Sequence, residues 1–260
     1  MSDLRSKISA TFGHVIQSIA IIGNGKVGRY LLAQLRQNGW SVQAYARRPG
    51  LQEKPLDALK PGEHDLLLLA VSDDALAPVA QALAVSNSLV AHVSGATPLE
   101  ALAPHARRAI WYPLMSLKPD LGLPIGRIPF CLEAAQGADL EALEDFTHRL
   151  KATPYRVDSR QRPYLHLAAV FAHNFSNHLY HLAYQILQQQ NLPWPLLHPL
   201  LQQATQQLSA ADPAQRQTGP AVRQDQQTLE RHRALLDDPQ LKELYNRLTE
   251  HIIRTHEKEL

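Results

Sequence analysis

The sequence contains a single cysteine, Cys131, so no disulfide can form within the chain. A chain without disulfides is typical of a reducing compartment, and we therefore expect a cytoplasmic protein. We interpret Cys131, which stands in an apolar stretch, as a small buried residue. Arg5 and Lys7 near the N-terminus are not followed by an apolar segment, which predicts no signal peptide. The longest apolar run, Leu66 to Val71, is too short to span a membrane.

The sequence also lacks an excess of charge of one sign. Its 26 lysines and arginines stand against 24 acidic residues, which gives a formal net charge of +2. Such a balance does not create the broad positive surface that binds nucleic acid or an anionic membrane. The chain has 13 histidines, but it has no H-E-x-x-H motif and no set of cysteine ligands. We therefore expect no nucleic acid, no membrane and no metal among its partners.

Up to about residue 158, short apolar runs alternate with segments of helical periodicity. The runs that predict strands are 19–22, 42–45, 66–71, 89–93, 109–112, 128–132 and 155–157. This alternation predicts an α/β fold with a doubly wound parallel sheet. The rest of the chain is rich in Leu, Gln, Arg and His, and prolines divide it into four or five expected helices. We therefore expect two domains, residues 1–158 with the sheet and an all-α domain over residues 159–260.

A glycine-rich motif follows the first predicted strand and opens the first predicted helix. It consists of Gly23, Asn24, Gly25, Lys26, Val27 and Gly28, and it matches G-x-G-x-x-G. Gly23 allows a tight turn, Gly25 lets a pyrophosphate approach the backbone, and Gly28 lets the helix pack close to the strand. The free N–H groups at the start of the helix favour an anion. The motif in this context predicts a Rossmann dinucleotide-binding domain, in which these six residues contact the cofactor.

The end of the second predicted strand indicates which dinucleotide binds. A site for NAD usually has an acidic residue there, which accepts a hydrogen bond from the ribose 2′-hydroxyl. This chain instead has Arg47 and Arg48, whose guanidinium groups suit a 2′-phosphate. We therefore expect NADP as the cofactor. Val71 and Ser72, after the third strand, are further candidate contacts, although this segment equally fits a helix cap supplied by Asp73 or Asp74.

Two other segments carry candidate reaction chemistry. Ser94 and Gly95 follow the next strand, and strand C-termini are where ligands bind in open α/β sheets. The alternative is a turn that caps the segment after Pro98. His166 lies on the first long helix after the sheet, on one stripe with Val170, His173 and Asn177 if that helix is regular. We predict that His166 supplies a proton, with Asn174 and Ser94 orienting the substrate and Gly95 binding it. A histidine bonded within the core is the alternative for His166.

Four segments together resemble a known family. They are HVSG at 92–95, YPLMS at 112–116, LHLAAVFAHNF at 165–175 and TGPAVRQD at 218–225. The chain resembles the Rossmann-like NADP oxidoreductases whose helical C-terminal part is a domain of unknown function (the DUF-2520 type). This family is similar to the ketopantoate, pyrroline-carboxylate and hydroxyisobutyrate reductases. The resemblance implies a homodimer formed through the helical domain and an active site in the cleft between the domains.

The resemblance has two departures. Gln224 stands where the family usually has glycine, and the lysine of the related reductases is not matched, because its position holds His166 or a neighbour. A lysine-based mechanism is therefore not implied. Arg223 could bind a substrate carboxylate or pair with Asp225 as part of a buried loop anchor.

Two functions fit these observations. The first is an NADPH-dependent reductase of a small carbonyl or imine compound, with a carboxylic acid as one kind of substrate. The second is a regulatory or scaffold protein that binds NADP without catalysis. The absence of the lysine of the related reductases is compatible with this non-catalytic function. The sequence does not name the substrate.

Overall fold

The computed structural model describes residues 15–117, 122–208 and 212–256. Arg5 and Lys7, on which the signal-peptide prediction depends, lie outside these ranges. The chain divides into two compact units, Met1–His178 and Leu179–Leu260, and each is considered separately below. The sheet ends close to residue 158, where the composition changes, but the following helix also belongs to the first unit.

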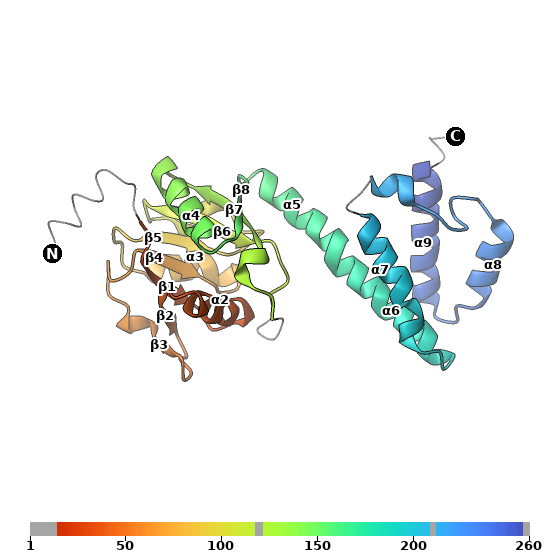
Figure 1. The fold of residues 1–260 in the computed structure, drawn as a ribbon, viewed down its shortest axis with the longest axis horizontal. Helices are drawn as coiled ribbons and strands as arrows, with labels where there is room; N and C mark the ends of the chain where they lie inside the picture. The colour runs from red at the N-terminus through yellow and green to blue at the C-terminus, as the bar shows by residue number, and fades with distance from the viewer. Residues whose placement is uncertain (1–14, 118–121, 209–211, 257–260) are drawn as a thin grey trace. The chain divides into compact units, whose positions relative to one another are not determined.

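The first unit contains one sheet of eight strands in the order β3-β2-β1-β4-β5-β6-β7-β8 (Figure 1). The strands are β1 (Ser18–Ile22), β2 (Ser41–Ala46), β3 (Glu53–Pro55), β4 (Leu66–Leu69), β5 (Leu89–His92), β6 (Arg108–Pro113), β7 (Pro129–Ala134) and β8 (Thr153–Arg156). The predicted doubly wound α/β fold is confirmed. The order reverses between β1 and β4, and ligands bind at the carboxyl ends of strands at such a switch point.

The prediction of a parallel sheet is wrong for one pair, because β6 and β7 are antiparallel. A parallel pair needs a crossover of a dozen or more residues, usually with a helix. The described part of the connection from β6 to β7 contains only the short 3-10 turn Ile125–Arg127 (η4). The chain therefore re-enters the sheet in the opposite direction.

Alternate residues of each central strand enter two separate cores. Ile19 and Ile21 of β1 pack on the face covered by α2 (Lys26–Gln37) and α4 (Gly137–Arg149). Ala20 and Ile22 pack on the other face, beneath α3 (Asp73–Ala82) and the 3-10 turn Leu99–Leu102 (η2). This two-sided burial explains why the β1 and β4 segments are continuously apolar.

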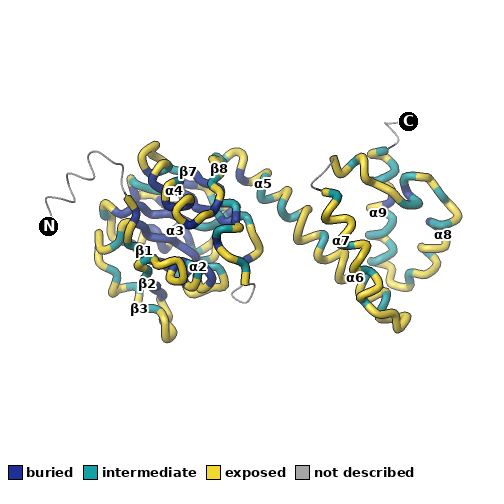
Figure 2. Tube along the Cα trace, in the orientation of Figure 1, coloured by how far each residue is buried: buried dark blue, intermediate teal, exposed yellow. Residues whose placement is uncertain are grey.

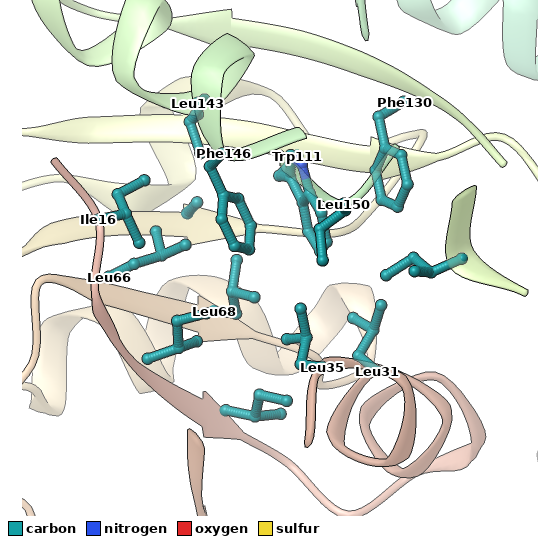
Figure 3. Packing of buried hydrophobic residues seen from close by; sticks show 14 of the residues in the cluster. Ile16, Leu31, Leu35, Leu66, Leu68, Trp111, Phe130, Leu143, Phe146 and Leu150 are labelled. Atoms are coloured by element: carbon teal, nitrogen blue, oxygen red, sulfur yellow. The ribbon is translucent and has the colours of Figure 1, made fainter. Parts of the chain in front are cut away.

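The first core is centred on Trp111 of β6. Its ring stacks on Phe130 of β7 with the centroids 4.1 Å apart, and its indole nitrogen donates a hydrogen bond to Thr147. Phe146 of α4 lies beside the same indole, with the ring centroids 5.1 Å apart, and Leu35 of α2 belongs to the same core (Figure 3). The antiparallel pair β6–β7 is thus fixed by large buried side chains as well as by backbone hydrogen bonds.

One long helical segment follows the sheet. It consists of α5 (Gln161–Ala169), a π-helical turn at Val170–Phe175 (η5) and α6 (Ser176–Gln189). A π-helical turn bonds residue i to i+5, so it changes the angle at which the following side chains leave the axis. The regular α-helical stripe predicted for His166, Val170, His173 and Asn177 is therefore wrong beyond Val170.

The second unit is helical, as the sequence predicts. Besides most of α6 it contains α7 (His198–Gln207), α8 (Gln226–Ala234) and α9 (Pro239–His256), with 3-10 turns at Trp194–Leu197 (η6) and Pro213–Arg216 (η7). Tyr245 of α9 hydrogen-bonds to His232 of α8 over 2.9 Å, and Asn246 accepts a hydrogen bond from Arg233. Within the described ranges, no helix has both the length and the apolar character that crossing a membrane requires.

Burial differs strongly between the two units (Figure 2). The buried side chains belong mainly to the sheet and its covering helices, whereas the helical segments after residue 160 remain largely accessible in the single chain. Leu196, Leu200 and Leu235 of the second unit are each at least 60% exposed. The buried apolar residues described for the second unit are few, among them Ala221 and Leu229.

Candidate dinucleotide site and the adjoining tyrosine–histidine pair

The glycine-rich loop leaves no space for side chains at two of its three glycines. Gly23 has a φ of +119°, and a Cβ on it would come closer than 3.0 Å to the carbonyl oxygen of Ala70. A Cβ on Gly28 would come equally close to the carbonyl oxygen of Gly23. Gly25 differs, because an added Cβ would meet no atom within 4 Å. The loop is therefore tightly packed on its inner side and open beside Gly25.

The open side of the loop leads directly into a helix. Gly25 is the N-cap of α2, and no side chain bonds to the first N–H groups of this helix. Lys26 and Val27 are its first two residues. Free N–H groups and the positive end of the helix dipole at one point make a site for a phosphate group.

A hollow of about 710 Å³ lies over this loop. Its wall is formed by Ile22, Gly23, Asn24, Gly25, Ala46, Arg47, Arg48, Leu56, Ala70, Val71, Ser72, Ala75 and Val79. The structure thus brings together most of the predicted cofactor residues, from the ends of β1, β2 and β4. A volume of this size is typical of a small-molecule site. A second hollow of about 500 Å³ shares Arg47 and Leu56 with the first.

Arg47 and Arg48 are exposed at the edge of the hollow. Neither forms an ion pair with any acidic side chain in the described part of the chain. The side chain of Asn24 donates a hydrogen bond to the carbonyl oxygen of Arg48 over 3.2 Å, which ties the glycine-rich loop to the arginine loop. Two guanidinium groups that pair with no acidic side chain among the described residues thus stand beside the free helix end. The residues present therefore fit a phosphorylated dinucleotide.

The loop after β4 closes the other side of the hollow. Ser72, and neither Asp73 nor Asp74, is the N-cap of α3, and its side chain makes no capping hydrogen bond. The two aspartates instead occupy the first turn, where the helix dipole favours negative charge. The Ser72 hydroxyl is therefore available to a ligand.

Ser94 is held by its own loop. Its hydroxyl oxygen accepts hydrogen bonds from the backbone N–H groups of Ala96 and Thr97, and its hydroxyl donates to the Thr97 side chain over 3.0 Å. These bonds match the alternative of a turn and cap after β5. The predicted role of Ser94 in orienting the substrate stays a prediction.

Gly95 lies against two aromatic side chains. The hydroxyl of Tyr112, on β6, hydrogen-bonds to Nδ1 of His166, on α5, over 3.2 Å. A Cβ on Gly95 would lie 2.6 Å from Cζ of Tyr112 and 2.8 Å from Nδ1 of His166. Glycine at this position therefore lets the Tyr112–His166 pair form. Gly95 and His166 were predicted from the sequence, whereas Tyr112, 54 residues from its partner, stood in a family-like segment without a predicted role.

A buried ion pair fixes the start of α5 and hence the position of His166. Arg162, one helical turn before His166, is 1% exposed and pairs with Glu133 of β7. The same guanidinium donates to the carbonyl oxygen of Thr97 over 2.9 Å. Ser159 donates a hydrogen bond to Glu133 over 2.7 Å. Arg162 and Glu133 were also missed, although the spacing of Arg162 and His166 places them on one helix face.

His92 is the buried histidine behind this pair. Its Nδ1 accepts a hydrogen bond from the backbone N–H of Ser94 over 3.2 Å. Burial, together with the nearby positive charge of Arg162, lowers the pKa of His92 to about 4. His92 is therefore neutral near pH 7 and serves the loop as a hydrogen-bond acceptor.

Two other predicted residues belong to different segments of the chain. Asn174 is exposed on the π-helical turn. Arg223 is exposed in the second unit, and Asp225 there caps α8 by accepting a hydrogen bond from the N–H of Thr228. Gln224 has a φ of +52°, a conformation that favours glycine, which is the residue usual in the resembling family. The roles of Asn174 and Arg223 stay predictions. The described residues contain no group of three or more metal-ligating side chains.

The sheet order, the glycine-rich loop and the helices that follow define a Rossmann-type unit joined to a helical one. Residues 128–252 match the family model described as "Domain of unknown function (DUF2520)". A solved structure of a candidate NADP oxidoreductase from Bacteroides fragilis is 30% identical, with a TM-score of 0.82, over 92% of this chain and 98% of the other. Residues 128–252 therefore form a DUF2520 domain, and the resemblance found in the sequence is confirmed.

Two more distant structures share the fold. A reductive aminase from Aspergillus terreus, in complex with NADPH and ethyl-5-oxohexanoate, is 17% identical with a TM-score of 0.66, over 93% of this chain and 95% of the other. A pyrroline carboxylate reductase from Plasmodium falciparum, with NADP bound, is 10% identical with a TM-score of 0.58, over 94% and 98% of the two chains. No protein in the curated set matches this sequence.

Proposed function

We propose that this protein is an NADPH-dependent reductase of a small carbonyl or imine compound. The observation that carries the proposal is the hollow in which the glycine-rich loop, the free end of α2 and two arginines meet, neither of which pairs with an acidic side chain among the described residues. The descriptions of related structures support it, since they name a candidate NADP oxidoreductase, a reductive aminase with NADPH and a pyrroline carboxylate reductase with NADP.

Each part of the hollow has a distinct task in this proposal. The first N–H groups of α2, from Gly25 onward, hold the diphosphate. Arg47 and Arg48 hold the 2′-phosphate, and Val71 and Ser72 border the ribose on the other side. The nicotinamide, when bound, supplies a hydride to the substrate. His166 is the source of the proton that the substrate receives, with Asn174, Ser94 and Gly95 around the acceptor and Arg223 on a substrate carboxylate.

Two successive measurements test this function, first the binding of the coenzyme and then the turnover of substrates. Calorimetric titration is expected to show NADPH binding more tightly than NADH, because only NADPH carries the 2′-phosphate that the arginines recognise. NADPH oxidation is then followed with 2-keto acids, β-keto acids, simple ketones and cyclic imines. Equal affinity for both coenzymes would contradict the role of the arginines. Tight NADPH binding without turnover of any compound would favour a regulatory or scaffold protein instead.

We also propose that the partner of the helical part is a second copy of this chain. Tyr164, Leu167, Phe171 and Phe175 are all more than half exposed along one helical segment, and Leu196 and Leu200 are equally exposed in the second unit. Extensive exposed apolar surface usually marks a protein interface. Sedimentation equilibrium at micromolar concentration is expected to give twice the chain mass of 29.0 kDa. A monomer under those conditions would contradict the homodimer. A cytoplasmic location stays a prediction.

A further inference from the structure

The carboxyl ends of four neighbouring strands lie side by side in the sheet. The pairing register puts Ile22 of β1, Leu69 of β4, His92 of β5 and Ile110 of β6 in one row. The glycine-rich loop, the Val71–Ser72 loop and the Ser94–Gly95 loop all begin just after this row. Tyr112 lies two residues beyond it, on the strand that follows β5 in the sheet. Neighbouring strands are about 4.8 Å apart, so Tyr112 continues the same ligand-binding edge.

The surroundings of Tyr112 keep its hydroxyl protonated and oriented. The ring is half-buried, and this burial raises the pKa of Tyr112 above its usual value. The hydroxyl is placed by the bond to His166, and His166 is in turn placed by the anchored Arg162 one turn earlier. A tyrosine that keeps its proton at neutral pH, beside an imidazole that can replace it, has the properties of a general acid.

We propose that Tyr112 is the residue that gives the proton to the substrate, and that His166 supplies Tyr112 through Nδ1. This inference rests on the proposed reductase function. The hydride brings two electrons to the substrate carbon, where a C–H bond forms while the C=O π bond breaks. The oxygen then takes the hydroxyl proton of Tyr112. The phenolic oxygen takes the proton from Nδ1 of His166 while Nε2 of the same half-exposed ring takes one from water, so the imidazole stays neutral.

A proton donor at this position narrows the substrate class. Hydride addition to a carbonyl leaves a negative oxygen that must be protonated, so an acid beside the oxygen stabilises the transition state. Hydride addition to an iminium ion gives a neutral amine and needs no proton in that step. The Tyr112–His166 pair therefore points to an aldehyde or ketone as the substrate and an alcohol as the product.

The test is Tyr112→Phe, which removes one hydroxyl and keeps the ring. With pyruvate, acetoacetate and cyclohexanone as carbonyl probes, we expect kcat to fall about 10²–10⁴-fold on each compound that the wild type reduces. The dissociation constant for NADPH is expected to stay unchanged. Tyr45→Phe is the matched control, because it removes a tyrosine–histidine hydrogen bond of the same 3.2 Å length, to His64, in the same unit. This control is expected to keep full activity.

A second measurement needs no coenzyme. Nitrogen NMR of the imidazoles, with His166→Gln to assign the signal, reports which ring nitrogen of His166 carries the proton. The proposed relay places the proton on Nδ1, where the hydrogen bond with Tyr112 holds it, so Tyr112→Phe is expected to change the spectrum of His166 whereas Tyr45→Phe leaves it unchanged.

Each other outcome overturns a specific statement. Full kcat in Tyr112→Phe, or an equal loss in Tyr45→Phe, contradicts the role of Tyr112. Turnover of 1-pyrroline by the wild type with no carbonyl probe reduced contradicts the substrate class. A His166 spectrum that is unchanged in Tyr112→Phe contradicts the supply of the proton. A wild-type protein that binds NADPH and reduces no probe contradicts the proposed function itself, and the inference falls with it.

Discussion

Replacing Glu133 by glutamine is expected to destabilise the first unit by about 3–5 kcal/mol, because the change leaves a buried guanidinium without its counter-ion. The side chain of Arg162 is 1% exposed, and that of Glu133 is 17% exposed. Arginine stays protonated, so it cannot avoid the cost by losing its charge. The amide of glutamine can still accept a hydrogen bond, but it does not neutralise the charge. The free energy of unfolding is measured by urea denaturation followed by circular dichroism.

Glu144→Gln is the matched control for this prediction. Glu144 also pairs with an arginine, Arg156, over 2.6 Å, but the arginine side chain is 64% exposed. Solvent screens such a pair, so its loss is expected to lower the free energy of unfolding much less than the loss of the Glu133 carboxylate. If Glu133→Gln proved no more destabilising than Glu144→Gln, the buried pair would not be what fixes the start of α5.

The double variant Arg47→Ala/Arg48→Ala is expected to weaken NADPH binding about 10²–10⁴-fold. A hydrogen bond to a charged group contributes about 1.5–3 kcal/mol, and two such contacts to the 2′-phosphate are lost. Affinity for NADH is expected to remain the same, because NADH has no phosphate at that position. The dissociation constants are measured by calorimetric titration of the purified protein with each coenzyme.

A loss of net positive charge alone would also weaken the binding of an anion. Arg36→Ala/Arg127→Ala removes the same charge from two exposed positions that do not line the hollow. This control is expected to bind NADPH like the wild type at physiological salt, where distant charges are screened. A similar loss of affinity in both double variants would show that Arg47 and Arg48 make no specific contact.

The sequence was sufficient for the features that follow a local pattern. Gly23, Gly25 and Gly28 have the spacing that a strand, a turn and a helix require. In the structure, a side chain has no space at Gly23 and Gly28, whereas Gly25 is open toward the hollow. The strands of the central sheet were also predictable, because burial on both faces leaves a continuous apolar run. By contrast, β3 reads Glu53-Lys54-Pro55 and has no apolar residue to indicate it.

What the sequence could not supply depends on contacts between distant segments. Tyr112 and His166 meet only because β6 ends beside the β5 loop while α5 returns to the same edge. The Glu133–Arg162 pair similarly depends on the position of β7 in the sheet. The π-helical turn was also unpredictable, because neither apolar periodicity nor proline marks Val170–Phe175. The spacing of apolar residues along one helix or strand carries no information on contacts between segments that are far apart in the sequence.

The antiparallel strand β7 determines where the chain can be cut into a sheet-containing fragment and a helical fragment. The family match begins at residue 128, within the sheet and directly before β7. A fragment that stopped at residue 127 would turn β6 into a bare outer edge and uncover Trp111 by removing Phe130. An uncovered apolar border of this kind invites aggregation. In evolution or in protein engineering, any exchange of the helical part between relatives should therefore carry the last two strands and α4 with it.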